Sequence, residues 1–209
     1  LLSVIGDDEA GDCLNALMSE HGVETVLMRD PNIPTTVKLR VVARNQQLIR
    51  LDFEDAPTHE VLNGVKNRFR ELLAECDVVI LSDYGKGGLT HVVSFIEWAR
   101  QAGKPVLIDP KGEDYAKYTG ATLLTPNRAE LRQVTGSWKN EADLQEKARA
   151  LQRNLDLQAL LLTRSEDGMT LFRDGEPHHQ PTQAREVFDV SGAGDTVIAG
   201  MGLAMAAGL

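Results

Sequence analysis

Short apolar runs alternate with stretches of helical periodicity along most of the chain. The runs are rich in Val, Leu and Ile and are bounded by polar or turn residues, which predicts buried strands at 77–81, 105–109, 121–124 and 159–163. Between them, apolar residues recur three and four positions apart, which predicts helices at 90–102 (with Thr90 as N-cap), 126–134 and 140–154. Buried strands that alternate with helices indicate βαβ units, so we expect an α/β fold with a mostly parallel sheet.

The two ends of the chain continue this alternation. The pattern predicts a strand at 1–5, a helix at 9–21, a strand at 23–28 and a helix at 60–74. Towards the other end, it predicts a strand at 169–173 and an apolar helix from about Gly194 onward. The sequence shows no internal repeat and no long linker. A single domain over 1–209 is therefore expected, with a small appendage at 35–53.

That appendage differs in its hydrophobic period. Two stretches, 36–42 and 48–53, alternate between apolar and polar residues on either side of a polar turn. A period of two puts one set of side chains on each face of a strand, so the segment is predicted to be a β-hairpin with one apolar and one partly basic face. The apolar set on its first strand is Val37, Leu39 and Val41.

Composition and charge narrow the class of protein. Of 209 residues, 42% are hydrophobic and 25% charged, values typical of a globular protein, and the formal net charge is -9. A field of this sign argues against nucleic acid or an anionic membrane as the main partner, and no apolar run approaches the length of a membrane span. Cys13 and Cys76 lie in apolar contexts without metal-ligand spacing, so we expect reduced core thiols and a cytoplasmic protein. The first residue is not Met and lies inside an apolar run, so we expect the natural chain to begin earlier.

Polar residues follow four of the predicted strands. They lie at 82–87, 109–112, 125–130 and 163–168, and each group combines charged or amide side chains with turn residues. Ligands of open α/β sheets bind beyond the carboxyl ends of the strands, so these segments are candidates for a binding site. Each segment taken alone is equally compatible with a solvated turn.

The segment Gly192–Ala193–Gly194 comes directly before the apolar helix at the end of the chain. Unpaired N–H groups and the positive end of the helix dipole meet there, and such small residues let an anion approach closely. We expect an anion hole for phosphate oxygens or for charge that develops in a transition state. Asp195 follows in the first turn, and two interpretations stay open: an acidic cap, or a base that removes a proton from an attacking hydroxyl.

Other nucleotide and metal motifs are absent from the sequence. No G-x-x-x-x-G-K-[ST] occurs, so a P-loop is excluded, and Val197 stands where G-x-G-x-x-G needs its third glycine. His178 and His179 form a pair without Cys or acidic partners at ligand spacing, and we predict a loop there without a metal.

Three motifs resemble those of one family. D-V-S-G-A-G-D-T at 189–196 resembles the C-terminal signature of the ribokinase/PfkB family of carbohydrate kinases, and T-P-N-R-A-E-L at 125–131 resembles its N-x-x-E motif. V-I-G-D-D-E-A-G at 4–11 resembles its early G-D-D-x-x-G segment, and the hairpin at 35–53 falls where the family has a β lid. The resemblance covers the whole chain in order. It implies a ribokinase-like three-layer sandwich that carries a small lid.

The family's functional residues map onto these motifs. The resemblance implies Asp195 as the catalytic base and Gly192, Ala193 and Gly194 as the anion hole. It implies that Asn127 and Glu130, at i and i+3 on one helical face, help to hold Mg²⁺, mostly through water. The expected ATP-binding residues are Asn127, Arg128, Ala129, Glu130, Thr163 and Gly168. Phosphoryl transfer needs in-line placement, charge neutralisation and a base, which agrees with these roles.

Within the family, the lid sequence and the segments L-S-D-Y-G-K-G and I-D-P-K-G look most like heptose 7-phosphate kinases of lipopolysaccharide core biosynthesis, which often form the N-terminal half of a bifunctional kinase/nucleotidyltransferase. This implies transfer from ATP to the 1-OH of D-glycero-D-manno-heptose 7-phosphate, giving the 1,7-bisphosphate for ADP-heptose. The candidate substrate residues are Lys38, Arg40, Arg50, Asp83, Lys86 and Lys111. For the lid cations, solvation or pairing with Asp52 or Glu54 remains an equal alternative.

Three further expectations concern the whole molecule. The apolar lid face needs cover, so we expect a homodimer through the lid. Compared with the family, the chain lacks a first strand with a glycine-rich sugar segment and the last helices, so we expect a kinase domain truncated at both ends. Two other functions stay open: another PfkB-type kinase, acting on fructose phosphate or a nucleoside, and a non-catalytic module that binds nucleotide or sugar phosphate.

Overall fold

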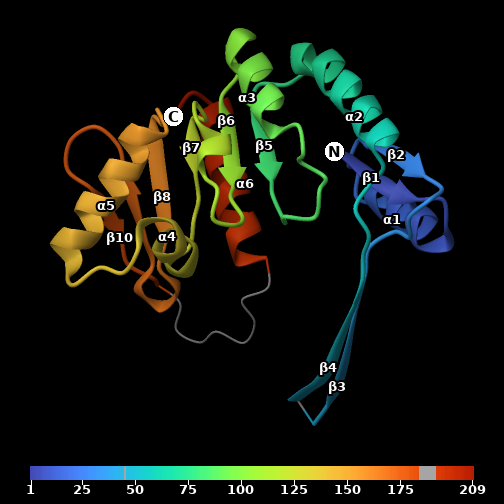
Figure 1. The fold of residues 1–209 in the computed structure, drawn as a ribbon, viewed down its shortest axis with the longest axis horizontal. Helices are drawn as coiled ribbons and strands as arrows, with labels where there is room; N and C mark the ends of the chain where they lie inside the picture. The colour runs from blue at the N-terminus through green and yellow to red at the C-terminus, as the bar shows by residue number, and fades with distance from the viewer. Residues whose placement is uncertain (45, 184–191) are drawn as a thin grey trace. The chain divides into compact units, whose positions relative to one another are not determined.

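The computed structural model describes residues 1–44, 46–183 and 192–209. Within them the chain forms two compact units (Figure 1). The first unit comprises Leu1–Glu71 together with Lys86–Thr90, and the second comprises Leu72–Gly85 together with His91–Leu209.

The second unit is built on a six-stranded sheet with the order β10-β9-β8-β7-β6-β5. Strands β5 to β8 are parallel to one another, and β9 and β10 are added antiparallel at one edge. Their bounds are β5 Val79–Ser82, β6 Val106–Asp109, β7 Leu123–Leu124, β8 Ala159–Thr163, β9 Met169–Phe172 and β10 His178–Gln180. The expected α/β fold with a mostly parallel sheet is therefore confirmed.

Helices cover both faces of this sheet. The bounds are α3 Val92–Gln101, α4 Arg128–Thr135, α5 Glu141–Asn154 and α6 Ala193–Ala206, with short 3-10 helices η1 Leu73–Glu75, η2 Ala116–Tyr118 and η3 Ser165–Asp167. In Figure 1, α3 and α5 lie in front of the sheet and α6 lies behind it. Because side chains alternate along a strand, each strand contributes apolar residues to both layers.

One core cluster joins α6 to the sheet. Its buried members are Leu107, Leu123, Leu161 and Ile198. At Gly202 the helix comes so close to the sheet that an added Cβ would lie 2.9 Å from Ile80 Cδ1. The helix therefore packs closely against the Ile80 side chain of β5 at this position.

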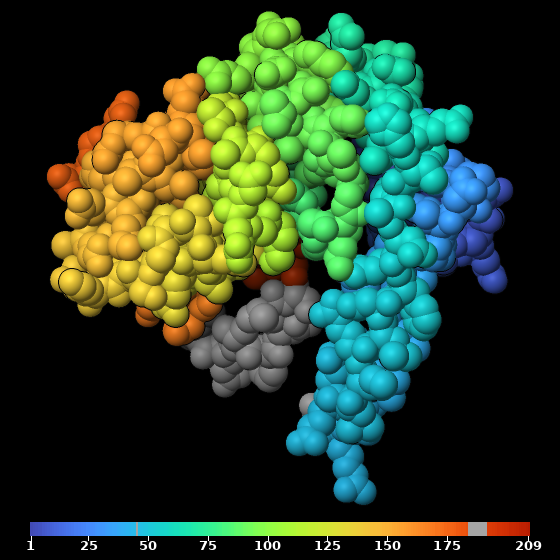
Figure 2. All heavy atoms as spheres, in the orientation of Figure 1, coloured from blue at the N-terminus to red at the C-terminus, as the bar shows by residue number. Residues whose placement is uncertain are grey.

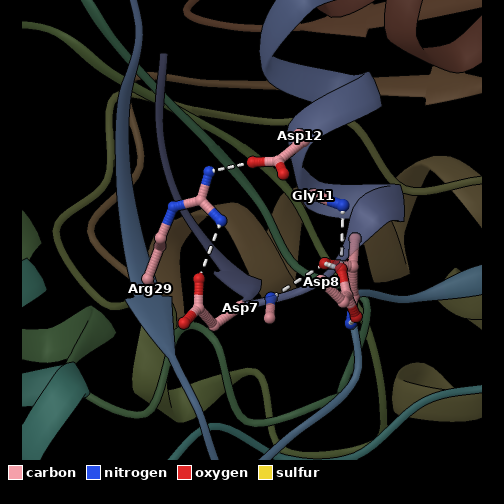
Figure 3. A network of polar contacts seen from close by, with 7 residues as sticks. Asp7, Asp8, Gly11, Asp12 and Arg29 are labelled. Carbon is pink, nitrogen blue, oxygen red and sulfur yellow. Dashed lines mark hydrogen bonds and ion pairs between the residues drawn. The ribbon is translucent and has the colours of Figure 1, made fainter.

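The first unit contains a parallel pair of strands, β1 (Leu2–Gly6) and β2 (Val26–Asp30), with α1 (Glu9–Glu20) between them in sequence. Asp8 is the N-cap of α1 and accepts the Gly11 N–H at 2.8 Å (Figure 3). The same view shows Arg29 between Asp7 and Asp12, with which it forms ion pairs. The helix α2 (His59–Leu72) follows the hairpin and packs with Leu62, Val65 and Phe69 buried.

Two carboxylates hold the two roots of the predicted hairpin. Thr35, just before the hairpin, donates its N–H and its hydroxyl to Asp8 at 2.7 and 2.6 Å. Thr58, just after it, donates its N–H to Asp30 at 2.8 Å. Asp30 is fully buried, and hydrogen bonds from Thr58 lower its pKa to about 2. Both ends of the hairpin are thus fixed to the strands of the first unit.

The hairpin consists of β3 (Val37–Ala43) and β4 (Gln46–Phe53), in agreement with the prediction. Figure 2 shows it as an arm that extends from the rest of its unit. The register pairs Val37 with Phe53, Leu39 with Leu51 and Val41 with Ile49, and all six side chains are exposed. These six residues form a continuous apolar face, called the lid face below.

Three predictions from the pattern are wrong in detail. His178 and His179 lie in β10, because they pair with Leu171 and Thr170 of β9, and not in a loop. The N-cap of α3 is His91, while the Thr90 hydroxyl instead donates to Gly87 O at 2.6 Å. Cys13 is exposed and so is not a core thiol, because among the residues of α1 only Gly11 is buried.

Candidate functional site

The carboxyl ends of β5, β6, β7 and β8 meet at one edge of the second unit's sheet, because these strands are parallel neighbours. Three of the four predicted polar segments follow directly: 109–112 after β6, 125–130 after β7 and 163–168 at the end of β8. Of the segment after β5, Ser82 to Gly85 belong to this unit and Lys86 to the first unit. Strand pairing thus brings segments that are distant in sequence to one edge.

Asn127 and Glu130 form a capping box at the start of α4. The Asn127 side chain accepts the Glu130 N–H at 3.0 Å, and the Glu130 carboxylate accepts the Asn127 N–H at 3.0 Å. This fixes both side chains at the N-terminus of the helix, with Glu130 buried and Asn127 exposed. The capped helix start is therefore present, and it is compatible with further contacts because a carboxylate oxygen accepts more than one hydrogen bond.

The remaining Glu130 oxygen binds Lys111. Lys111 Nζ lies 2.9 Å from Glu130 Oε1, and this hydrogen bond raises the pKa of Lys111. The Lys111 side chain is 52% exposed, so the ammonium group can reach other acceptors. Lys111, a predicted substrate residue, and Glu130, a predicted metal-binding residue, therefore neutralise each other.

Asp83 lies at the end of β5 and is buried. Its carboxylate accepts the Gly85 N–H at 2.7 Å, the Lys117 ammonium at 2.7 Å and the Tyr118 hydroxyl at 2.7 Å. Burial alone would raise the pKa of Asp83, and the three hydrogen bonds outweigh it, so the pKa lies below its usual value. The carboxylate is thus ionised and rigidly held, and any further acceptor role uses lone pairs that these donors leave free.

Asp109 was not assigned a role from the sequence, and it lies among the charged groups of this edge. It is the last residue of β6, and its backbone O accepts the Asp83 N–H at 3.0 Å. Burial, then the neighbouring Glu130 and Asp195, raise the pKa of Asp109 to about 6. The sequence does show an acid at the end of this apolar strand. It does not show which charged groups lie near Asp109, because they come from three other segments.

The helix α6 presents its N-terminus to the same group of residues. Gly192 is its N-cap, with a left-handed backbone at φ 75°, and Ala193, Gly194 and Asp195 form the first turn. Asp195, in this turn, is one of the neighbouring charges that raise the pKa of Asp109 at the end of β6. The first N–H groups of a helix have no intrahelical acceptor, so this turn can bind an anion. Asp189 to Ser191 of the signature lie outside the described residues.

The segment 163–168 forms a tight turn between β8 and β9. Arg128, in the first turn of α4, forms an ion pair with Asp167 at 2.5 Å. Gly168 has φ 87°, and a Cβ there would lie 2.1 Å from Gln180 O, so the turn requires glycine. Thr163 donates its N–H to Pro126 O at 3.0 Å. The predicted ATP-binding residues of 127–130 and 163–168 are therefore adjacent.

Arg164 also stabilises this turn. Its guanidinium binds both oxygens of Glu141, the first residue of α5, at 2.7 and 2.8 Å, and Thr170 Oγ1 at 3.2 Å. Arg164 is buried, and sequence reasoning had assigned it no role. A basic residue directly after the buried apolar strand β8 is the signal that could have identified it.

The lid cations belong to the first unit. Lys38, Arg40 and Arg50 share the polar face of the hairpin, where Lys38 is opposite Asp52 and Arg40 is opposite Arg50. Arg50 forms an ion pair with Asp52 at 2.8 Å, so the alternative of pairing within the lid is realised for this residue. Lys86 pairs with Glu54, beside the root of the lid. The predicted substrate residues thus divide between the two units, with Asp83 and Lys111 in the second.

The donor set fits Mg²⁺ held through water. Glu130 and Asn127 offer oxygens that Mg²⁺ accepts, but each already has a protein partner, which favours contact through water over direct coordination. Within the described ranges, no three His, Cys, Asp or Glu side chains are grouped so as to hold a metal ion.

None of the helices seen in this part of the chain is long and apolar enough to cross a membrane.

A mostly parallel sheet, with charged residues at its carboxyl edge and the N-terminus of α6 near the end of β6, defines an α/β protein of the kind that binds its ligand at this edge. A family model described as pfkB family carbohydrate kinase matches residues 1–209. The chain belongs to this family, whose members are phosphotransferases that use ATP. The resemblance found in the motifs is thereby confirmed.

Two relatives are similar to the chain in sequence over its whole length. The chain is 54% identical over its whole length to the bifunctional protein HldE of Chromohalobacter salexigens, of which it covers 44%, and 50% identical to the D-beta-D-heptose 7-phosphate kinase of Bordetella bronchiseptica, of which it covers 67%. The chain therefore spans less than half of the first relative and about two thirds of the second.

Solved structures match the fold. Escherichia coli phosphofructokinase-2 in a tetrameric inhibited form matches 99% of the chain and 70% of that protein, with a TM-score of 0.80 and 16% identity. Arabidopsis thaliana ribokinase complexed with ribose and ATP matches 99% of the chain and 69% of that protein, with a TM-score of 0.78 and 21% identity. The ribokinase-like α/β fold predicted from the motifs is thus confirmed.

Proposed function

We propose that this chain carries the kinase activity that phosphorylates D-glycero-D-manno-heptose 7-phosphate at its 1-OH with ATP, giving the 1,7-bisphosphate for ADP-heptose and lipopolysaccharide core synthesis. The observation that carries the proposal is 50% identity over all 209 residues to a protein named D-beta-D-heptose 7-phosphate kinase. Because ATP is the phosphoryl donor, the reaction takes place in the cytoplasm.

Asp195 acts as the base in this proposal. Its carboxylate stands in the first turn of α6 and takes the proton of the 1-OH as that oxygen attacks the γ-phosphorus of ATP. The N–H groups of Gly192, Ala193 and Gly194 stabilise the charge that develops on the transferred phosphoryl group. The bond to the β-phosphate oxygen breaks as the new bond forms, so ADP is the leaving group.

ATP lies along the turn at 163–168 and the start of α4 in this proposal. Arg128 and Asp167, paired at 2.5 Å, hold the turn against the helix that carries Asn127 and Glu130. Mg²⁺ bound through water beside Asn127 and Glu130 would neutralise phosphate charge. Release of Lys111 from Glu130 would make its ammonium group available to a sugar phosphate.

The lid has two roles in this proposal, substrate binding and dimer formation. On its polar face, Lys38, Arg40 and Arg50 bind the doubly charged phosphate of the sugar. The lid face exposes three pairs of apolar side chains, between 39% and 51% each, and a second copy of the same face can cover them. We therefore infer a homodimer formed through the lid.

The test is phosphoryl transfer from ATP and Mg²⁺ to heptose 7-phosphate or fructose 6-phosphate, followed by ³¹P NMR on the intact protein. We expect a new anomeric phosphate on the heptose alone. Asp195→Asn should lose nearly all turnover while it keeps its affinity for ATP. Transfer to fructose 6-phosphate instead would assign a different sugar kinase, and ATP binding without transfer to any sugar would assign a binding module.

A further inference from the structure

Tyr118 lies between two loops that carry the predicted substrate residues Asp83 and Lys111. Its ring is fully buried, and it ends the short helix η2 after β6. The hydroxyl donates to Asp83 Oδ2 at 2.7 Å and accepts the Lys111 N–H at 3.0 Å, with Lys111 O also within 3.2 Å. One hydroxyl therefore joins the loop after β5 to the loop after β6.

The protonation states of the two groups favour a strong hydrogen bond from Tyr118 to Asp83. Burial raises the pKa of Tyr118, which keeps the hydroxyl protonated at neutral pH, so that it can donate to Asp83. The Asp83 carboxylate that it binds is ionised, and a hydrogen bond to a charged acceptor is stronger than one between neutral groups. Lys117 lies over the Tyr118 ring at 4.8 Å and binds the same Asp83 oxygen at 2.7 Å.

The neighbouring Tyr115 provides a comparison within the same core. Its ring packs edge-on against that of Tyr118 at 5.4 Å, and it is 2% exposed. Its hydroxyl has no hydrogen-bond partner among the residues that the structure describes. Two buried tyrosines of equal size thus differ in whether the hydroxyl reaches the loops at the strand ends.

We propose that Tyr118 is a positioning residue for recognition of the sugar phosphate, because its hydroxyl fixes Asp83 and the backbone of Lys111 at one distance from each other. The proposal rests on the proposed function and on the prediction from the sequence that Asp83 and Lys111 bind the sugar phosphate. The hydrogen bonds of the Tyr118 hydroxyl are to Asp83 and to the backbone of Lys111, and not to the nucleotide segments at 127–130 and 163–168. Loss of the hydroxyl should therefore weaken sugar-phosphate binding selectively.

The test compares Tyr118→Phe with the matched control Tyr115→Phe in the intact protein. Each variant loses one buried hydroxyl and keeps its ring. We expect Tyr118→Phe to raise KM for heptose 7-phosphate about tenfold, with KM for ATP and kcat within about twofold of wild type. Tyr115→Phe should leave all three values within about twofold. Equal behaviour of the two variants, or an equal rise in both KM values for Tyr118→Phe, would overturn the proposal.

A second measurement does not depend on catalysis. Amide hydrogen exchange at Lys111 and Gly85 should become faster in Tyr118→Phe than in Tyr115→Phe, because Lys111 loses its acceptor and Asp83 loses a donor. Unchanged exchange would overturn the positioning role even if the substrate proves to be another sugar. A wild-type protein with no transfer to heptose 7-phosphate but with the expected exchange would refute the proposed substrate alone.

A further variant applies if Tyr118→Phe does not fold. Lys117→Met removes the other side-chain donor to Asp83 and keeps both tyrosines. We expect a smaller, several-fold rise in KM for the sugar phosphate with KM for ATP unchanged. An unchanged KM for the sugar phosphate would show that the donors around Asp83 do not position it for binding.

Discussion

Lys111 Nζ lies 2.9 Å from Glu130 Oε1, so the cation that follows β6 and the acid that begins α4 neutralise each other. Glu130 is almost completely buried, whereas the Lys111 side chain is half exposed. The acid is therefore held by the capping box, and the cation is the more exposed partner. In the proposed reaction this pair is a resting state from which phosphate can draw the lysine away.

Glu130→Gln separates the structural role of this acid from its charge. Glutamine at the third helical position keeps the capping box, so the free energy of unfolding should change by less than about 1 kcal/mol. The loss of the carboxylate should lower kcat/KM for ATP with Mg²⁺ by about 10- to 100-fold. Steady-state kinetics over a range of Mg²⁺ concentrations checks this.

Asn140→Ala is the control for helix capping. Asn140 caps α5 by accepting the Asp143 N–H at 2.9 Å, outside the proposed site. Its removal should cost about 1 kcal/mol of stability and leave the Mg²⁺ dependence unchanged. A Glu130→Gln variant with normal Mg²⁺ dependence would remove Glu130 from the metal role.

Asp109→Asn should change how stability depends on pH. Burial, Glu130 and Asp195 raise the pKa of Asp109 to about 6, above the usual 3.8. Between these values the folded protein binds more protons than the unfolded chain, so this group makes stability fall as pH rises from about 4 to 6. The variant lacks this cost, so its melting temperature relative to wild type should rise over that window.

The size of this effect is modest because Asp109 is only partly buried. A shift of about two pKa units, reduced for solvent screening, leaves about 1 kcal/mol, or about 2–4 °C in Tm above pH 6. Thermal melts at pH 4, 5, 6 and 7 measure it. A constant difference between the two proteins at all four pH values would contradict the prediction.

Arg164→Met should destabilise the second unit. The guanidinium makes two hydrogen bonds to Glu141 and one to Thr170 from a buried position, and methionine replaces none of them. We expect a loss of about 2–3 kcal/mol in the free energy of unfolding, measured by urea denaturation. Because the turn at 163–168 loosens, KM for ATP should rise as well.

The matched control for Arg164 is Arg68→Met. Arg68 pairs with Glu71 on the exposed surface of α2. Such a pair contributes about 0.5 kcal/mol or less, so this variant should resemble wild type in both measurements. Equal losses of stability in the two variants would show that the buried hydrogen bonds of Arg164 contribute no more than an exposed ion pair.

Leu39→Glu tests the dimer. The side chain lies opposite Leu51 in the middle of the lid face, so a charge there should disrupt burial by a second copy. Light scattering of the intact protein at micromolar concentration should give a dimer for wild type and a monomer for the variant. Thr36→Glu, at an exposed position just before β3, is the control and should remain dimeric. A monomeric wild type would refute the lid dimer.

The hydrophobic pattern predicted most elements because they depend on local periodicity. The strands β5 to β8 are apolar runs, and the hairpin alternates with period two, so both were found from the sequence. His178 and His179 escaped because an exposed edge strand needs no apolar run, only backbone pairing with β9. Cys13 was misplaced because helical spacing identifies an apolar stripe but not what covers it.

The site was predictable where a motif carries it and not where contacts span the fold. Asp195, Asn127 and Glu130 lie in motifs that the sequence displays. Tyr118 meets Asp83 from 35 residues away, and no spacing along the chain indicates that contact. Lys111 and Asp83 were identified from their place after strands, but their resting partners follow only from the strand order.

The bare backbone at Gly202 has a consequence for Asp195. The two residues lie on the same helix, seven positions and about two turns apart. In the proposed reaction Asp195 is the base, so a methyl group at 202 that moved α6 away from Ile80 would also move the carboxylate relative to the 1-OH. Close packing at Gly202 thus bears on the position of the proposed base about 10 Å away.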